Sequence, residues 1–202
     1  MKRLILVTVL SASSSVFAAD GGKVPVTEQY AIDVSHSAVV FGWNHFGFSN
    51  PTARFDKIDG SVLLDKTDLT KSSISVTLPL EGLDTGVTKL DEALKGPDFF
   101  DEAKYPTITF TSTKVEKAGE NGLKITGNLT IHGVTKPVTL DAKVNKIGIF
   151  EIPGVIKAQA AGFDATTVIK RSDFGVSKYV PAVSDDIPVR ITLDAKQVQA
   201  TS

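Results

Sequence analysis

The sequence predicts an all-β fold, in which about eight antiparallel strands form a barrel or a sandwich and one short helix accompanies them. Three observations lead to this prediction. About eight segments alternate between apolar and polar residues, Gly, Asn and Asp turns separate them, and one segment alone has helical spacing. Most of these segments are apolar on one face only. A sheet of that kind must cover its dry face, either by packing on a second sheet or by closing into a barrel.

The first 29 residues read as a leader rather than as part of the fold. Lys2 and Arg3 give a short positive start, and the run 4–10 is apolar but for Thr8. Small residues then precede Ala19, which predicts a signal peptide over 1–18 that is cleaved after Ala18. The apolar run is far shorter than the roughly 20 residues of a membrane-spanning helix. Residues 19–29 are expected to form a flexible leader, residues 30–198 a single barrel domain, and the product to reach the periplasm.

Alternation begins at Tyr30 and is clearest in the segment 38–46. There Val39, Phe41, Trp43 and His45 share one face, which is expected to be the inner one. The remaining strands are expected at 61–64, 73–80, 107–111, 123–131, 138–144, 155–163 and 187–195.

The segment Thr88 to Lys95 is the predicted helix. Leu90 and Leu94 stand four residues apart, and Gly96-Pro97 ends the pattern. A helix of this length is too short to cover a sheet face but long enough to cap an open end. The aromatic pair that follows, Phe99-Phe100, is expected to pack beneath it.

The composition excludes several classes of function. The net charge is −1 and no basic block occurs, which argues against nucleic acid or an anionic membrane surface as a partner. The chain has no cysteine, so disulfides, thiol chemistry and cysteine-ligated metals are excluded.

Catalytic and metal-binding patterns are not evident. The three histidines, His36, His45 and His132, lack the spacing that places two ligands on one side of an element. No strand–turn–helix carries a G-x-S-x-G nucleophile. We therefore expect no catalytic residue, no metal and no cofactor. Arg171 and Asp173 stand two apart, which on a strand places them on one face. They are interpreted as a surface ion pair, with an anchor for a polar ligand head as the alternative.

Several motifs together resemble the YceI-like family of exported, lipocalin-like proteins that bind polyisoprenoids, and they cover Tyr30 to about Ala195 in the family's order. The most distinctive one runs from Gly127 to Val138. The others are Tyr30-x-Ile32-Asp33-x-x-His36-Ser37, His45-Phe46-Gly47, Phe55 with Gly60, Leu83-Asp84-Thr85-Gly86, Asp98-Phe99-Phe100-Asp101, Tyr105-Pro106-x-Ile108-x-Phe110-x-Ser112 and Arg171-Ser172-Asp173-Phe174-Gly175.

The resemblance implies an antiparallel barrel of about eight strands with an elongated channel. It further implies a long isoprenoid ligand, such as a polyprenyl phosphate or a prenylated quinone, and a homodimer. The chain departs from the family on the capping helix, where Leu90-Asp91-Glu92-Ala93-Leu94 replaces the frequent Arg-Asp-x-His-Leu. If the two missing polar side chains contact the head group in relatives, the head group bound here differs or is held less tightly.

The expected function is therefore that of a periplasmic carrier of an isoprenoid lipid, without stable membrane insertion and without catalysis. Two alternatives stay open: an enzyme that acts on such a lipid through His45, Asp91 or Arg171, and a filled barrel that serves protein interaction or a stress response. The residues expected to contact the ligand are Phe41, Trp43, His45, Phe46, Phe55, Ile74, Val76, Leu78, Asp91, Phe99, Phe100, Phe110, Leu129, Ile131, Phe163, Ile169, Arg171 and Phe174.

Overall fold

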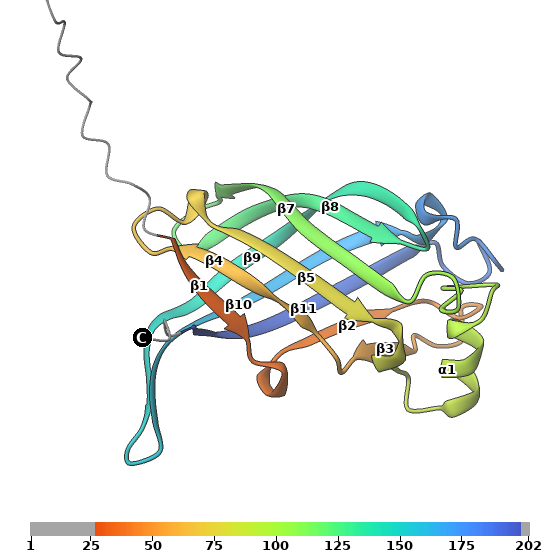
Figure 1. Cartoon of the computed structure of the whole chain (residues 1–202). Helices are drawn as coiled ribbons and strands as arrows, with labels where there is room; N and C mark the ends of the chain where they lie inside the picture. Colours follow the sequence, from red (N-terminus) through yellow and green to blue (C-terminus); the bar gives the residue numbers. More distant parts are fainter. Residues whose placement is uncertain (1–26, 199–202) are drawn as a thin grey trace, which may run out of the picture.

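The computed structural model describes residues 27–198, within which eight strands close into an antiparallel barrel (Figure 1). Going round the ring, the order is β1, β4, β5, β7, β8, β9, β10 and β11, and β11 pairs again with β1. The barrel alternative of the sequence analysis is therefore confirmed. The expected signal peptide and residues 19–26 of the expected leader lie outside the described residues.

The elements follow the predicted order but differ in their ends. The helix α1 spans Thr88–Lys95, as predicted, and the 3-10 turns are η1 (Val34–His36), η2 (Leu69–Lys71), η3 (Leu80–Gly82) and η4 (Arg171–Phe174). The strands are β1 (Thr27–Ile32), β2 (Ala38–Gly42), β3 (Thr52–Phe55), β4 (Asp59–Asp65), β5 (Ser73–Pro79), β6 (Leu83–Asp84), β7 (Thr107–Lys117), β8 (Gly122–Ile131), β9 (Val134–Ile152), β10 (Ile156–Lys170) and β11 (Asp186–Gln197).

Alternation produces the two faces of the barrel wall. On β8, for example, Leu123 and Ile131 point inward and are buried. The outward positions carry threonines that pair across strands, with Oγ1 atoms 3.0 Å apart for Thr126 and Thr139 and 2.8 Å apart for Thr130 and Thr135. The wall is thus dry inside and polar outside, as the one-sided segments predicted.

The barrel changes its construction toward the end that carries α1. β1 pairs with the last part of β11, whereas β2 pairs with its first part, and η1 separates the two strands. β3 and β6 continue the sheet from β2, and β6 forms its edge instead of pairing with β7. The closed ring of eight strands therefore stops short of this end, where α1 contacts β6. Figure 1 shows α1 at this end of the barrel.

Several boundaries differ from the prediction for physical reasons. β1 begins at Thr27, inside the expected leader, because Thr27–Ala31 pairs with β4 despite its polar composition. The segment predicted as one strand over 38–46 ends at Gly42, since the chain turns into a loop that bonds to residues 182–184. β3 and β6 were not predicted, because they are too short to show a period.

β9 and β10 are much longer than their predicted segments, 138–144 and 155–163. Their hairpin runs on past the barrel end that lies opposite α1 (Figure 1). Around Ile149 and Ile152, which are both exposed, the hairpin extends beyond the barrel wall. Its side chains there no longer alternate between the inside and the outside of the barrel, so the sequence lacks the apolar–polar alternation that predicts a strand.

Candidate ligand-binding site

An elongated cavity of about 960 Å³ occupies the barrel interior. Its lining includes inward-facing residues of β7 from Ile108 to Val115, a span of roughly 20 Å along the barrel axis at the usual strand rise and tilt. The volume lies at the upper end of the range for small-molecule pockets. The walls are almost wholly aliphatic and aromatic, so the space is suited to a long, slender apolar molecule.

Aromatic side chains form the wall on the α1 side. The Phe41 ring lies at the centre of this group, with centroid distances of 5.9 Å to Trp43, 5.8 Å to Phe55 and 6.2 Å to Phe100. These separations are those of favourable tilted and edge-on ring pairs. The group belongs to the main buried cluster, so the wall is held by packing before any ligand enters.

The opposite end of the cavity is closed by aliphatic side chains. Leu64 and Leu123 are 1% and 5% exposed, and Val115 is also buried. Leu69 of η2 lies across this end and packs against two of the buried clusters. The cavity is therefore blind here, and the α1 end carries its mouth.

The mouth lies between α1 with the residues after it and the two loops 43–51 and 175–185. Lys178 forms an ion pair with Asp98 across it. The rings of Phe99 and Tyr179 also approach across the mouth, with centroids 6.4 Å apart. His45, Phe46 and Tyr179 line the cavity and are exposed to solvent, so they mark its rim.

All of the residues predicted to contact a ligand line this cavity except Asp91. Asp91 instead faces the loop before α1, where it accepts hydrogen bonds from the backbone N–H and the hydroxyl of Thr85, each at 2.7 Å. The prediction for Asp91 was therefore wrong. In the first turn of this short helix, the Asp91 carboxylate holds the segment that precedes α1 instead of facing the cavity.

His45 reaches the cavity at its rim rather than within the wall. Its N–H donates to the Ser49 carbonyl at 2.8 Å, its backbone bridges to Val183, and its ring lies edge-on to Phe46 at 4.9 Å. The expectation that it shares a strand face with Val39 was wrong, since the strand ends before it.

Arg171 is buried and binds backbone carbonyls, not Asp173. Its guanidinium donates to the carbonyls of Val176, Val183 and Ser184, each at 2.9 Å. Burial lowers the pKa of Arg171, and the carboxylate of Asp185 opposes this effect. The prediction of an Arg171–Asp173 pair assumed a strand, whereas the segment is the 3-10 turn η4. Although Arg171 borders the cavity, its donors serve to hold the loop 175–185 in place.

Part of the mouth was not predicted from the sequence. Five further residues line the cavity without having been predicted as ligand contacts, namely Leu90 and Glu92 of α1 and Lys178, Tyr179 and Val183 of the loop 175–185. The helical spacing of Leu90 and Leu94 was a usable signal for α1. No periodic signal exists for an irregular loop.

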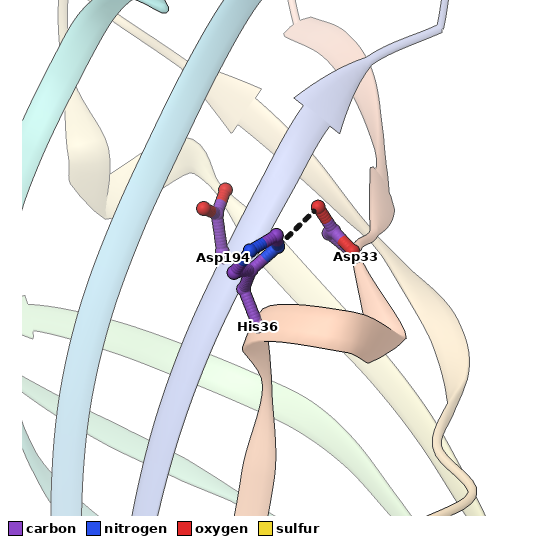
Figure 2. A group of neighbouring side chains, drawn as sticks. All are labelled: Asp33, His36 and Asp194. Carbon is purple, nitrogen blue, oxygen red and sulfur yellow. Dashed lines mark hydrogen bonds and ion pairs between the residues drawn. The ribbon is translucent and has the colours of Figure 1, made fainter.

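A second group of polar side chains lies outside the cavity, at the turn between β1 and β2. One ligand atom from each of Asp33, His36 and Asp194 falls within 4.8 Å of the others (Figure 2). The Asp33 carboxylate accepts from His36 Nδ1 at 2.9 Å and from Lys196 Nζ at 2.5 Å, and these bonds lower its pKa to about 2. The Lys196 ammonium thus already supplies a positive charge here. We interpret the group as a structural ion-pair network that fixes the turn.

Within residues 27–198, a closed antiparallel barrel around an elongated apolar cavity has the architecture of a lipocalin-like barrel. The chain belongs to the YceI-like domain family, whose model matches residues 30–195. Protein YceI of Escherichia coli O6:H1 is 36% identical over 190 residues, which cover 93% of this chain and 95% of that protein.

Solved structures share the fold. BcnA of Burkholderia cenocepacia has a TM-score of 0.72 at 27% identity, over 81% of this chain and 98% of that one. A polyisoprenoid-binding domain from Saccharophagus degradans has a TM-score of 0.65 at 17% identity, over 84% of this chain and 98% of that domain. Among residues 27–198, no helix is long and apolar enough to cross a membrane.

Proposed function

We propose that the chain is an exported binding protein that carries a long-chain isoprenoid lipid in its barrel. The observation that carries the proposal is the cavity of about 960 Å³, which is apolar along its length. Buried aliphatic side chains close one end, and solvent-exposed residues line it at the α1 end. Such a space admits a tail lengthwise and leaves a head group at the mouth. The S. degradans domain, which is described as polyisoprenoid-binding, supports this choice of ligand.

The energetics are those of a tail binder. Burial contributes roughly 0.8 kcal/mol per CH₂ group, so a few isoprene units supply on the order of 10 kcal/mol before costs. Ordering the tail and losing free tumbling take back several kcal/mol or more. Micromolar affinity needs about 8 kcal/mol net. A tail of many units therefore binds without a strong polar anchor, which agrees with Arg171 being occupied by carbonyls.

The head group is either a polyprenyl phosphate or a prenylated quinone. The charged side chains that line the cavity toward its mouth include Glu92, Asp98, Lys178 and Arg171. Lys178 is paired with Asp98, and the Arg171 guanidinium donates to three backbone carbonyls. With both cations occupied, this group of side chains favours an uncharged quinone head over a phosphate. The signal peptide predicted over 1–18 supports export and a periplasmic location, and the proposal assigns no catalytic step to the chain.

The filled-barrel alternative does not agree with the structure, since it required a barrel without a continuous cavity. The enzyme alternative lacks its expected arrangement. Among residues 27–198, no carboxylate is bonded to the ring of the rim residue His45. Asp91 lies outside the cavity, and Arg171 donates to backbone carbonyls.

Loading the protein with a prenylated quinone and counting bound lipid by native mass spectrometry tests the proposal. Val138→Trp places a large ring from the wall into the cavity and is expected to abolish loading. Thr139→Trp is the matched control, because the next residue along β9 is exposed on the outer face. Equal loading of the two variants, or no uptake by the unaltered protein, would contradict a tail bound inside the barrel.

A further inference from the structure

Three aromatic side chains of the two loops that border the mouth are exposed to solvent, and we call Phe46, Phe48 and Tyr179 together the exposed rim. The exposed fractions are 91% for Phe48, 54% for Tyr179 and 50% for Phe46. They come from the loops 43–51 and 175–185, which are bonded to each other where the Phe46 N–H donates to the Ala182 carbonyl at 2.8 Å. Large apolar groups gathered at one place on a protein surface mark an interaction site.

The backbone holds two of these rings outward. Phe46 and Tyr179 have φ angles of 53° and 64°, a left-handed conformation that bulky residues seldom adopt. The bridge between His45 and Val183 fixes both loops at this point. The exposure of the rings is therefore a property of the folded loops.

The exposed rim is continuous with the cavity. Phe46 and Tyr179 each contribute to the lining while a part of the same side chain faces solvent. A tail that leaves the cavity on this side passes along ring faces. Because both the tail and the exposed rings are apolar, the environment that suits this side of the mouth is itself apolar and not water.

We propose that this rim docks onto a lipid bilayer, with Phe46, Phe48 and Tyr179 in the interfacial region, so that the tail moves between bilayer and cavity without crossing water. The amphipathic ring of Tyr179 suits that region, and the apolar rings of Phe46 and Phe48 can be buried at the boundary between headgroups and acyl chains. This docking rests on the proposed function, because its role would be to let the carried lipid enter and leave the cavity.

The charges around the mouth select the kind of bilayer. The segment from Asp84 to Tyr105, which contains α1, carries three lysines and, with Asp84 included, six acidic residues. Lys178, on the opposite side of the mouth, is paired with Asp98. An excess of negative charge does not attract anionic lipid. The docking is therefore driven by insertion of the rings, and its partner is a bilayer without net negative charge.

A second exposed apolar site provides a control. At the tip of the β9–β10 hairpin, Val155, Ile149 and Ile152 are 78%, 51% and 47% exposed. This hairpin extends from the barrel end opposite α1, so docking through it would leave the mouth in water (Figure 1). Substitutions at the two ends of the barrel therefore distinguish the rim from general surface hydrophobicity.

Flotation of the full chain with phosphatidylcholine vesicles tests the docking. Phe48→Ser is expected to weaken vesicle binding about tenfold, from the lost burial of one ring, without changing thermal unfolding. Phe48→Trp should keep the binding, and Val155→Ser should leave it unchanged. Added phosphatidylglycerol should not strengthen binding, nor should salt weaken it.

Several outcomes would overturn the docking: equal binding by Phe48→Ser, loss of binding in Val155→Ser, or binding that requires phosphatidylglycerol. A further such outcome is measured by light scattering. If Phe48→Ser dissociates a dimer, the rings contact a second copy of the chain and not a bilayer. Loading from detergent separates this inference from the proposed function. Quinone loading without vesicle binding refutes the docking alone, and vesicle binding without quinone loading refutes the proposed function alone.

Discussion

Lys196 Nζ lies 2.5 Å from Asp33 Oδ2, and this ion pair joins β11 to the turn between β1 and β2. This turn connects β1 and β2, which both pair with β11 at different positions along its length. Backbone bonds reinforce the junction, since the Asp33 N–H donates to the Asp194 carbonyl at 2.8 Å. The Asp33-x-x-His36-Ser37 motif therefore has a structural role in this chain.

The ion pair predicts a defined loss of stability in acid. The Lys196 and His36 bonds lower the pKa of Asp33 from 3.8 to about 2. A lowered pKa means that the stabilisation is complete above about pH 4 and is lost as the pH falls toward 2, amounting to about 2 kcal/mol. Lys196→Met should lower the free energy of unfolding at pH 7 and flatten its dependence on pH between 4 and 2. Urea unfolding across this range measures both, and an unchanged slope would refute the assignment.

Arg171 should matter more for stability than for affinity. Arg171→Lys cannot reproduce three bonds to backbone carbonyls and leaves some of these buried acceptors without a donor. We expect the free energy of unfolding to fall by about 2–4 kcal/mol. Lys170→Met is the control, because the exposed Lys170–Asp186 pair should contribute less than about 1 kcal/mol. Weaker quinone binding without a change in unfolding would instead make Arg171 a ligand anchor.

Asp91 should act through the start of α1. Asp91→Ala removes two bonds to Thr85, so we expect a loss of about 1–2 kcal/mol and faster amide hydrogen exchange across Thr88–Lys95. Glu92→Ala is the matched control, since Glu92 is directed to the cavity mouth. Exchange that is accelerated equally in both variants would count against the specific role of Asp91.

The sequence predicted those features that repeat along the chain. Period-two alternation identified the inner face of most strands, and it predicted Phe41, Phe110 and Ile131 as inward-facing residues, which line the cavity in the structure. The bounds of α1 followed from leucines four apart and from Gly96-Pro97. The pattern does not distinguish a barrel from a sandwich, since either arrangement covers the dry face of the sheet.

What the sequence could not predict depends on contacts between distant segments. Lys178 and Asp98 are 80 positions apart, and no local pattern brings them to the same mouth. The error at Arg171 had a local cause, because spacing of two means a shared face only if the segment is extended. Here the chain turns at η4, and the side chain finds carbonyls 5 to 13 residues ahead.

Gly127 should set the width of the cavity beside Phe110. A Cβ at this position would lie 2.4 Å from Phe110 Cζ and 2.6 Å from the Thr111 carbonyl oxygen. Gly127→Ala must therefore push the ring into the cavity and strain the β7–β8 pairing. We expect a loss of about 1–3 kcal/mol in the free energy of unfolding and a preference for shorter tails.

Gly148→Ala is the control for this change, because its nearest neighbour atom is 4.0 Å away at the end of the Lys146 side chain. Phe110→Leu in the Gly127→Ala background removes most of the ring but keeps the contact with the carbonyl. It should restore binding of long tails while recovering only part of the stability, because the ring narrows the cavity and the carbonyl strains the sheet. Calorimetric titration with prenylated quinones of increasing length measures the first effect and urea unfolding the second. Unchanged length preference in Gly127→Ala would show that the ring does not limit the cavity.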